Sequence, residues 1–202
     1  AHKLRFALTG LAVVLGVAFM AGTMILTDTM DRTFSGLFET SNAGIDVVVQ
    51  RPVAVDAEFN DARERVDAAT LDRVLAVGGV EGAAGSVQGF VQLVDANGEA
   101  RVSDGLTTTI GMNWVTEAGL SPFSIAEGEA PTGADEVVID GASAEREGWA
   151  IGDTLTVLAV GEPRDLTLVG TAAYGEVDGL PGTTIVAVED STAQELFAEP
   201  GY

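Results

Sequence analysis

Carboxylates are the only chemically versatile side chains that this sequence offers in quantity. It contains 31 Asp and Glu residues and no cysteine, while His2 is the only histidine and Lys3 the only lysine. A Ser-His-Asp triad needs a histidine, a P-loop needs a lysine after its glycines, and structural zinc sites are built from cysteine and histidine. Since His2 and Lys3 both precede a long apolar segment, the sequence excludes these chemistries beyond it.

Two short stretches place acids where a site could lie. Asp95–Glu99 (DANGE) starts like a calcium loop, but Ala100 stands where an EF-hand needs glycine, so a hairpin turn explains it better. Gly152-Asp153 is explained as the turn that enters the next strand. A glycosidase needs a pair of acidic residues facing each other across a cleft. Among 31 acidic residues such a pair can always be imagined, so the sequence gives no specific evidence for one. We assign no catalytic, cofactor-binding or metal-ligating residue and predict that the chain is not an enzyme and has no cofactor.

The two tryptophans, Trp114 and Trp149, could stack on a sugar or a lipid. Large aromatic residues more often fill or rim a hydrophobic core. We expect that role for both and assign neither to a binding site.

The charge of the chain is distributed unevenly. All 31 acids lie at or beyond Asp28, and taking Lys3 and Arg5 from the 10 basic residues leaves 8, so that part carries a net charge of −23. Such a surface stays soluble and repels phosphate backbones and anionic headgroups. We therefore exclude nucleic acid as a partner.

The segment Phe6–Thr27 carries no charged residue. As a helix it would span about 33 Å, enough to cross a hydrocarbon core of roughly 30 Å. A signal peptide would have a shorter apolar region, and the best cleavage candidate, Gly16-Val17-Ala18, lies in the middle of the run. We predict a helix that spans the lipid bilayer.

The charges on the two flanks of this segment set its expected orientation. Lys3 and Arg5 lie before it, and Asp28 and Asp31 lie after it. Because basic flanks stay in the cytoplasm, we expect a cytoplasmic N-terminus, a chain in the cell membrane, and an outer domain that is extracellular or periplasmic.

Helical spacing of apolar residues continues beyond the apolar segment. Such residues recur every three or four positions at Leu26, Met30, Phe34, Leu37 and Phe38, with no proline among them. We predict that residues 1–43 form the membrane helix and a stalk that continues it.

Small residues four apart lie within the span, at Ala12 and Gly16 and at Ala18 and Gly22. They would let another helix approach closely, although small residues are common in any spanning helix, and both interpretations stay open. Together with the stalk they favour one helix of a larger bundle.

Residues 44–202 alternate short apolar runs with turn signals. The predicted strands are Gly44–Gln50, Glu136–Asp140 and Gly182–Val188, with hairpins at 90–102 around Asn97-Gly98 and between Leu155–Val160 and Leu166–Ala172. The predicted helices are 67–79, capped by Asp67 or Thr70, then 141–148, and one from Ser191 with Thr192 and Glu195 at capping-box spacing. Many short strands and few helices indicate an α+β domain on a mixed or antiparallel sheet.

Two blocks of the sequence resemble an FtsX/MacB-type ABC transporter permease. They are Lys3–Val49, with LGVAFMAGTMILTDTM and GIDVVV, and Glu136–Asp153, with EVVIDGASAEREGWAIGD. The resemblance covers nearly the whole chain, although residues 51–130 match only in general character. It implies that 1–43 are the first membrane helix and stalk and that 44–202 are a MacB-like extracytoplasmic core domain. Further membrane helices would follow, so we expect the chain to be truncated at its C-terminus.

The same resemblance implies a function. The chain would belong to a permease subunit that transmits ATP-driven motion from a separate cytoplasmic ABC ATPase to the outer domain, for export, extraction or cell-envelope regulation. The implied partners are that ATPase and further transmembrane helices of the same permease or of a second permease copy. The alternative is a membrane-anchored extracellular binding module without an ATPase partner.

Overall fold

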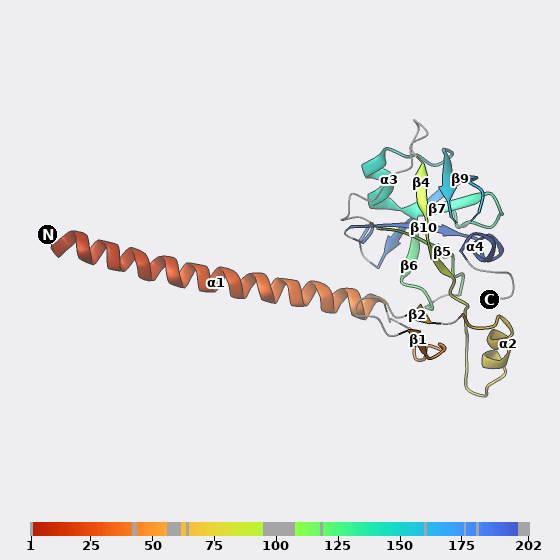
Figure 1. Ribbon diagram of the computed structural model, residues 1–202, viewed down its shortest axis with the longest axis horizontal. Coiled ribbons are helices and arrows are strands. Elements are labelled where there is room, and N and C mark those ends of the chain that lie inside the picture. The colour runs from red at the N-terminus through yellow and green to blue at the C-terminus, as the bar shows by residue number, and fades with distance from the viewer. Residues whose placement is uncertain are drawn as a thin grey trace. The chain divides into compact units, whose positions relative to one another are not determined.

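A computed structural model describes residues 2–41, 44–55, 62–63, 65–94, 108–117, 119–159, 161–175, 177–180 and 182–197 (Figure 1). The chain separates into two compact units, Ala1–Asn42 and Ala43–Tyr202.

The first unit is one uninterrupted helix, α1 (His2–Ser41), of 40 residues. At 1.5 Å per residue it is about 60 Å long. Gly36 does not interrupt it, because a single glycine weakens a helix by only about 1 kcal/mol. The prediction that the helix continues past the apolar segment is confirmed.

The second unit combines ten short strands with three helices in its described part. In chain order the elements are β1 (Val53–Val55), β2 (Ala62–Arg63), α2 (Ala69–Leu75), β3 (Gln88–Phe90), β4 (Gln92–Val94), β5 (Thr108–Asn113), β6 (Phe123–Gly128), β7 (Glu136–Asp140), α3 (Gly141–Glu147), β8 (Thr154–Leu158), β9 (Arg164–Tyr174), β10 (Thr183–Val188) and α4 (Asp190–Phe197). The strands β1 and β2 form a separate antiparallel pair. The predicted α+β class is confirmed.

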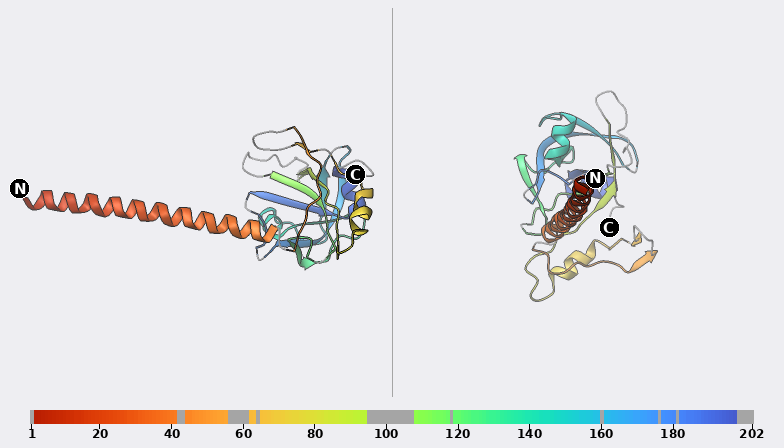
Figure 2. Two further views of the ribbon diagram at one scale, coloured as in Figure 1. Left: turned by 90° about the horizontal axis from the view of Figure 1, so that it is seen from below. Right: turned by 90° about the vertical axis from the view of Figure 1, so that its left-hand side faces the viewer.

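The other eight strands form one sheet that curls round until its ends are joined. The strand order is β3-β5-β10-β7-β9-β8-β4, with β6 paired to β9. The two end strands, β3 and β4, are separated in the chain only by Val91, so the segment 88–94 links both ends of the order (Figure 2). The pairs β5/β10 and β7/β9 are parallel and the others antiparallel, which confirms the mixed sheet.

Strand residues alternate between the two faces of the curled sheet and build two apolar clusters. In β7, Val137 and Ile139 belong to the larger cluster and Val138 to the smaller one. The larger cluster combines residues from β7, β8, β9, β10 and the segment 88–94 with Leu196 and Phe197 of α4. Because successive strand residues point to opposite faces, one continuous apolar run in β7 serves both clusters.

Several predicted elements are confirmed. The hairpin of β8 and β9 has Leu155 opposite Leu166, and Gly161 in its turn has φ +119°, which favours glycine. The strands β7 and β10 and the helix α3 lie where the sequence places them. The interpretation of Gly152-Asp153 as a turn is also confirmed, since Gly152 has φ +100° and the Asp153 carboxylate accepts the N–H of Ala150 at 2.9 Å.

The prediction of a strand at Gly44–Gln50 is wrong. Residues 45–50 belong to no strand, and none of them makes a backbone–backbone hydrogen bond within the described part of the chain. Val47, Val48 and Val49 are 77%, 61% and 51% exposed. A β-branched run favours extended backbone, but a strand also needs a neighbour.

Two helix boundaries differ from the prediction. The helix predicted at 67–79 is shorter, because α2 spans Ala69–Leu75. Its N-cap residue is Ala68, so the prediction that Asp67 or Thr70 caps the helix is wrong, although Asp67 Oδ1 accepts the N–H of Ala69 at 2.8 Å. The capping box of Thr192 and Glu195 is also wrong, since α4 begins at Asp190.

Another carboxylate caps α4. Glu189 Oε2 accepts the hydroxyl of Ser191 at 2.5 Å and the N–H of Thr192 at 3.3 Å. Glu195 instead pairs with Arg164 at 2.8 Å. The acceptor therefore precedes the helix, as an N-terminal cap requires.

The predicted turn at Asn97-Gly98 and the DANGE stretch, 95–99, lie outside the described residues. The strand before them, β4, pairs with β8.

Candidate functional site

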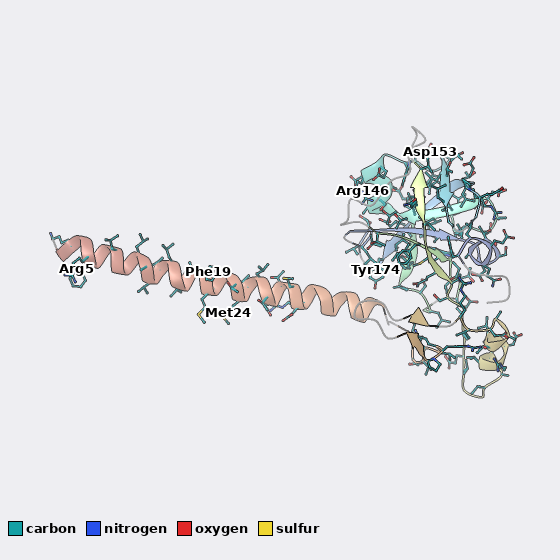
Figure 3. All side chains as sticks on the ribbon, in the orientation of Figure 1. Arg5, Phe19, Met24, Arg146, Asp153 and Tyr174 are labelled. Carbon is teal, nitrogen blue, oxygen red and sulfur yellow. The ribbon has the colours of Figure 1, made fainter. Side chains whose placement is uncertain are left out.

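The helix α1 has the composition of a membrane span. Gly10–Arg32 is long and apolar enough to cross a bilayer, with a mean hydropathy of 2.1. Phe19 and Met24 project outward from the helix and are 79% and 64% exposed (Figure 3). An apolar surface of this kind is stable in lipid, where the helix satisfies its own backbone groups.

Polar side chains in this helix are satisfied locally. The hydroxyl of Thr23 donates to the carbonyl of Phe19 at 2.9 Å, and that of Thr29 donates to Ile25 at 2.8 Å. Arg32 pairs with Asp28, one turn earlier, at 2.7 Å. Two of the first three charges after the apolar run, Asp28 and Arg32, thus neutralise each other where the span ends.

A buried polar cluster fastens α3 to the sheet. Asp140, at the end of β7, is 1% exposed, and its two carboxylate oxygens accept the N–H groups of Ser143 and Ile185, both at 2.8 Å. It therefore caps α3 and bonds to β10 at once. Gly179 lies so close to this cluster and to α3 that a Cβ there would come within 3.1 Å of the Cβ of Ala142.

Hydroxyl groups complete this cluster. The Oγ of Ser143 and the Oγ1 of Thr184 are 2.9 Å apart, and Arg146 Nη2 donates to both, at 3.0 and 2.9 Å (Arg146 is labelled in Figure 3). None of these contacts gives Ser143 a general base, because its hydroxyl faces another hydroxyl and a guanidinium. The cluster holds structure together and offers no nucleophile.

The helix α4 is held at both ends by parts of the chain far from it in sequence. At its start, Asn113 Nδ2 donates to Asp190 Oδ1 at 2.7 Å and to the carbonyl of Gly85 at 2.9 Å. At its end, Arg65 Nη2 donates to the carbonyl of Phe197 at 3.2 Å. The helix thus ties the segment 65–87 to the sheet.

Hydrogen bonds shift the titration of two carboxylates. The backbone N–H groups of Thr132 and Gly133, each 2.8 Å from Glu136 Oε2, lower the pKa of Glu136. The hydroxyl and backbone N–H of Ser191 lower the pKa of Glu189, with a smaller contribution from Thr192. As anions, Glu136 stabilises the turn before β7 and Glu189 stabilises the start of α4.

The residues that the sequence singled out have structural roles. Trp114 and Trp149 are half-buried and pack against the smaller and the larger apolar cluster, respectively, as expected for residues at the rim of a core. Asp153 closes a turn. Within the described residues, no group of three or more His, Asp or Glu side chains is arranged to hold a metal ion.

Sequence reasoning missed Asn113 and the glycine pair of β3 and β5. Gly89 lies opposite Gly111, and the side chain of Phe197 packs on both. Glycine inside a strand signals a close approach of other atoms, so that signal was present at both positions. The polar contacts of Asn113 could not be predicted from the residues next to it in the sequence, because its partners lie far along the chain.

Comparison with known proteins identifies the family of this chain. Residues 6–201 match the family model of the MacB-like periplasmic core domain. The fold is similar to the crystal structure of the periplasmic region of MacB from Actinobacillus actinomycetemcomitans, at 10% identity and a TM-score of 0.48, covering 70% of this chain and 69% of that one. A domain of a protein described as a permease from Porphyromonas gingivalis is also similar, at 9% identity and a TM-score of 0.34, covering 60% and 54%. No curated protein matches the chain significantly.

Proposed function

Because the chain belongs to the family of MacB-like periplasmic core domains, we propose that it forms the first membrane helix and outer domain of an ABC transporter permease. In this proposal residues 1–43 span the membrane and form a stalk, and residues 44–202 form the core domain outside the cytoplasm. A separate cytoplasmic ATPase supplies the energy.

The observation that carries the proposal is the family match across 6–201, which includes most of α1 as well as the outer domain. An anchor alone would require only a flexible tether after the membrane. Here the helix continues for nine residues beyond Arg32 to Ser41 without interruption. A continuous helix transmits a displacement because each turn is hydrogen-bonded to the next.

The proposed mechanism needs no chemistry in the outer domain. ATP binding and hydrolysis by the partner would move the cytoplasmic end of α1, and the stalk would pass that motion outward. The polar cluster at Asp140 and the two-ended attachment of α4 support this role, since they make the outer domain resist deformation. The outer domain would then act on a cargo or an envelope partner by changing its position.

The test is to purify the protein from its own membrane in mild detergent and identify what is retained with it. Our proposal requires a nucleotide-binding subunit in stoichiometric amount, whose ATPase rate changes when the permease is removed. An anchored binding module, the alternative, is favoured by the exposed run Val47–Val49. Recovery of the protein without any ATPase subunit would establish that alternative and refute our proposal.

A further inference from the structure

We propose that the helix α4 and the segment 65–87 (the arm) form a coupled pair, so that α4 sets the position of the arm. The arm contains α2 and is attached to both ends of α4. Displacing α4 from the sheet would therefore release the arm while the strands stay paired. The inference goes beyond the proposed function and depends on neither an ATPase nor a membrane.

The arm has little apolar core of its own. The helix α2 has no buried residue, and Leu75 and Val77 at its end are 47% and 58% exposed. Figure 1 shows α2 apart from the eight-stranded sheet. Because a helix of seven residues is unstable in isolation, the order of the arm depends on the contacts that its two ends make with the rest of the domain.

One end of the arm is fixed to the start of α4 by Asn113 of β5, which is 7% exposed. The Oδ1 of Asn113 accepts the N–H of Val87 at 2.8 Å. Its Nδ2 donates to the carbonyl of Gly85 at 2.9 Å and to Asp190 Oδ1 at 2.7 Å. A buried amide that uses both its donors and its acceptor oxygen is costly to separate from its partners. Asn113 therefore holds the last residues of the arm and the first residue of α4 together.

The other end of the arm is fixed to the last residue of α4. Arg65 Nη2 donates to the carbonyl oxygen of Phe197 at 3.2 Å. The last carbonyls of a helix lack partners within the helix and carry partial negative charge, which a guanidinium offsets. The eight residues of α4 extend over about 12 Å. The arm is thus attached at two separated points and cannot pivot freely about either.

The helix α4 is itself held on the sheet by side chains and not by strand pairing. Its buried residues are Thr192, Ala193, Leu196 and Phe197, and the ring of Phe197 lies over Gly89 and Gly111. The order of the strands does not pass through α4. Release of α4 together with the arm therefore costs less free energy than unfolding the whole domain.

Coupling of this kind is reciprocal. A change that favours release of α4 favours release of the arm by the same free energy, and the reverse also holds. In the proposed permease, a displacement of α4 would thus change the position of the arm while the curled sheet stays closed.

The test is amide hydrogen exchange of the full protein, measured by mass spectrometry in the peptides that contain α2 and α4. Gly111→Ala places a methyl group against the ring of Phe197, and this overlap is relieved when α4 leaves the sheet. We expect the exchange of α2 to become about ten-fold faster, although Gly111 lies in β5.

Val138→Ala is the control. Val138 is fully buried in β7 but belongs to the smaller apolar cluster, whereas Phe197 belongs to the larger one. The cavity left by the change weakens the whole domain and is not relieved by release of α4, so the exchange of α2 should change less than about two-fold. If Gly111→Ala left α2 unchanged, the arm would open independently of α4. If both variants accelerated α2 equally, the arm would open only with the whole domain. Either result would overturn the proposal.

Arg65→Ala tests the coupling in the reverse direction and leaves the apolar core intact. The exchange of α4 should become about five-fold faster, together with that of α2. Arg73→Ala is the matched control, because Arg73 Nη2 donates to Thr70 Oγ1 within the arm, at 2.6 Å, and the exchange of α4 should stay as in the wild type. An α4 that exchanges at the same rate in the Arg65 variant and in the wild type would also overturn the proposal.

The two proposals fail separately. Linked exchange of α2 and α4 in a protein that retains no ATPase subunit would refute the proposed function and leave the coupled pair standing. Retention of an ATPase by a protein in which α2 and α4 exchange independently would refute the coupled pair alone.

Discussion

The ring of Phe197 lies directly on the backbone of Gly111. A Cβ at Gly111 would overlap Cζ of that ring and would lie 2.6 Å from its Cε1 and 2.8 Å from Cγ1 of Val91. Gly89, opposite Gly111 in the β3/β5 pair, would place a Cβ 2.9 Å from the Cβ of Phe197. The end of α4 is therefore seated where two strands have no side chains.

Gly111→Ala should destabilise the outer domain by about 1–3 kcal/mol, because the added methyl overpacks a filled core. Urea unfolding followed by tryptophan fluorescence measures this, since both tryptophans pack against the clusters of this domain. Gly85→Ala is the control, because nothing lies within 4 Å of a Cβ there. Adding Phe197→Leu to Gly111→Ala should cost less than the two single changes together; strict additivity would contradict the packing explanation.

Asp140→Ala should destabilise the domain by about 2–4 kcal/mol. The change removes a helix cap and leaves the buried N–H groups of Ser143 and Ile185 without acceptors. Asp72→Ala, on the exposed face of α2, is the matched control and should change the free energy of unfolding by less than about 0.5 kcal/mol. Equal effects of the two changes would show that Asp140 does not hold α3 to the sheet.

Glu136 should make the domain more stable at neutral than at acidic pH. Its pKa is lowered in the folded state, chiefly by the N–H groups of Thr132 and Gly133. The folded state thus binds its proton less readily than the unfolded one, so this contribution is present above the unfolded pKa and is lost as pH falls through the folded value. The difference in unfolding midpoint between the wild type and Glu136→Gln should therefore shrink on acidification from pH 7 to pH 3.

Glu145→Gln, an exposed change on α3, corrects that comparison for the loss of one negative charge. If the unfolding midpoints of the Glu145→Gln and Glu136→Gln variants changed with pH in the same way as that of the wild type, the hydrogen bonds to Glu136 would not make the stability of the domain depend on pH.

Softening α1 where the apolar segment ends should uncouple the proposed ATPase from the outer domain. Replacing Asp31 and Arg32 by two glycines lowers helix stability by about 2 kcal/mol relative to two alanines. Both replacements keep the length, the net charge and the helical register, and both remove the Asp28–Arg32 pair. We expect ATP-dependent activity of the whole transporter to fall with the glycine variant and to survive with the alanine one. Full ATP-dependent activity of the two-glycine variant would show that the stalk does not transmit motion to the outer domain.

Single cysteines should report opposite sides of the membrane. In intact cells, Ser86→Cys, exposed before β3, should react with a membrane-impermeant maleimide, while His2→Cys should react only after permeabilisation. Replacing Lys3 and Arg5 by glutamate should weaken this asymmetry, because the basic flank is what retains the N-terminus inside. Labelling of His2→Cys in intact cells would reverse the proposed orientation.

The amino-acid sequence by itself determined the features that depend on near neighbours. The apolar run Phe6–Thr27 became part of an uninterrupted helix, because helical hydrogen bonds join residues four apart. The hairpin of β8 and β9 and the helix predicted at 141–148 followed for the same reason, since short turns and single helical turns are local.

Only the tertiary structure decided which segments pair and which side chains meet. The valine run at Val47–Val49 has the composition of a strand yet pairs with no strand among the described residues, and the closure of the sheet through 88–94 depends on partners far along the chain. The contacts of Asn113 with Asp190, and of Gly111 with Phe197, join residues more than 70 positions apart. Strand pairing and core packing are formed between distant residues, so a local pattern can state that a segment is ready to pair but not with what.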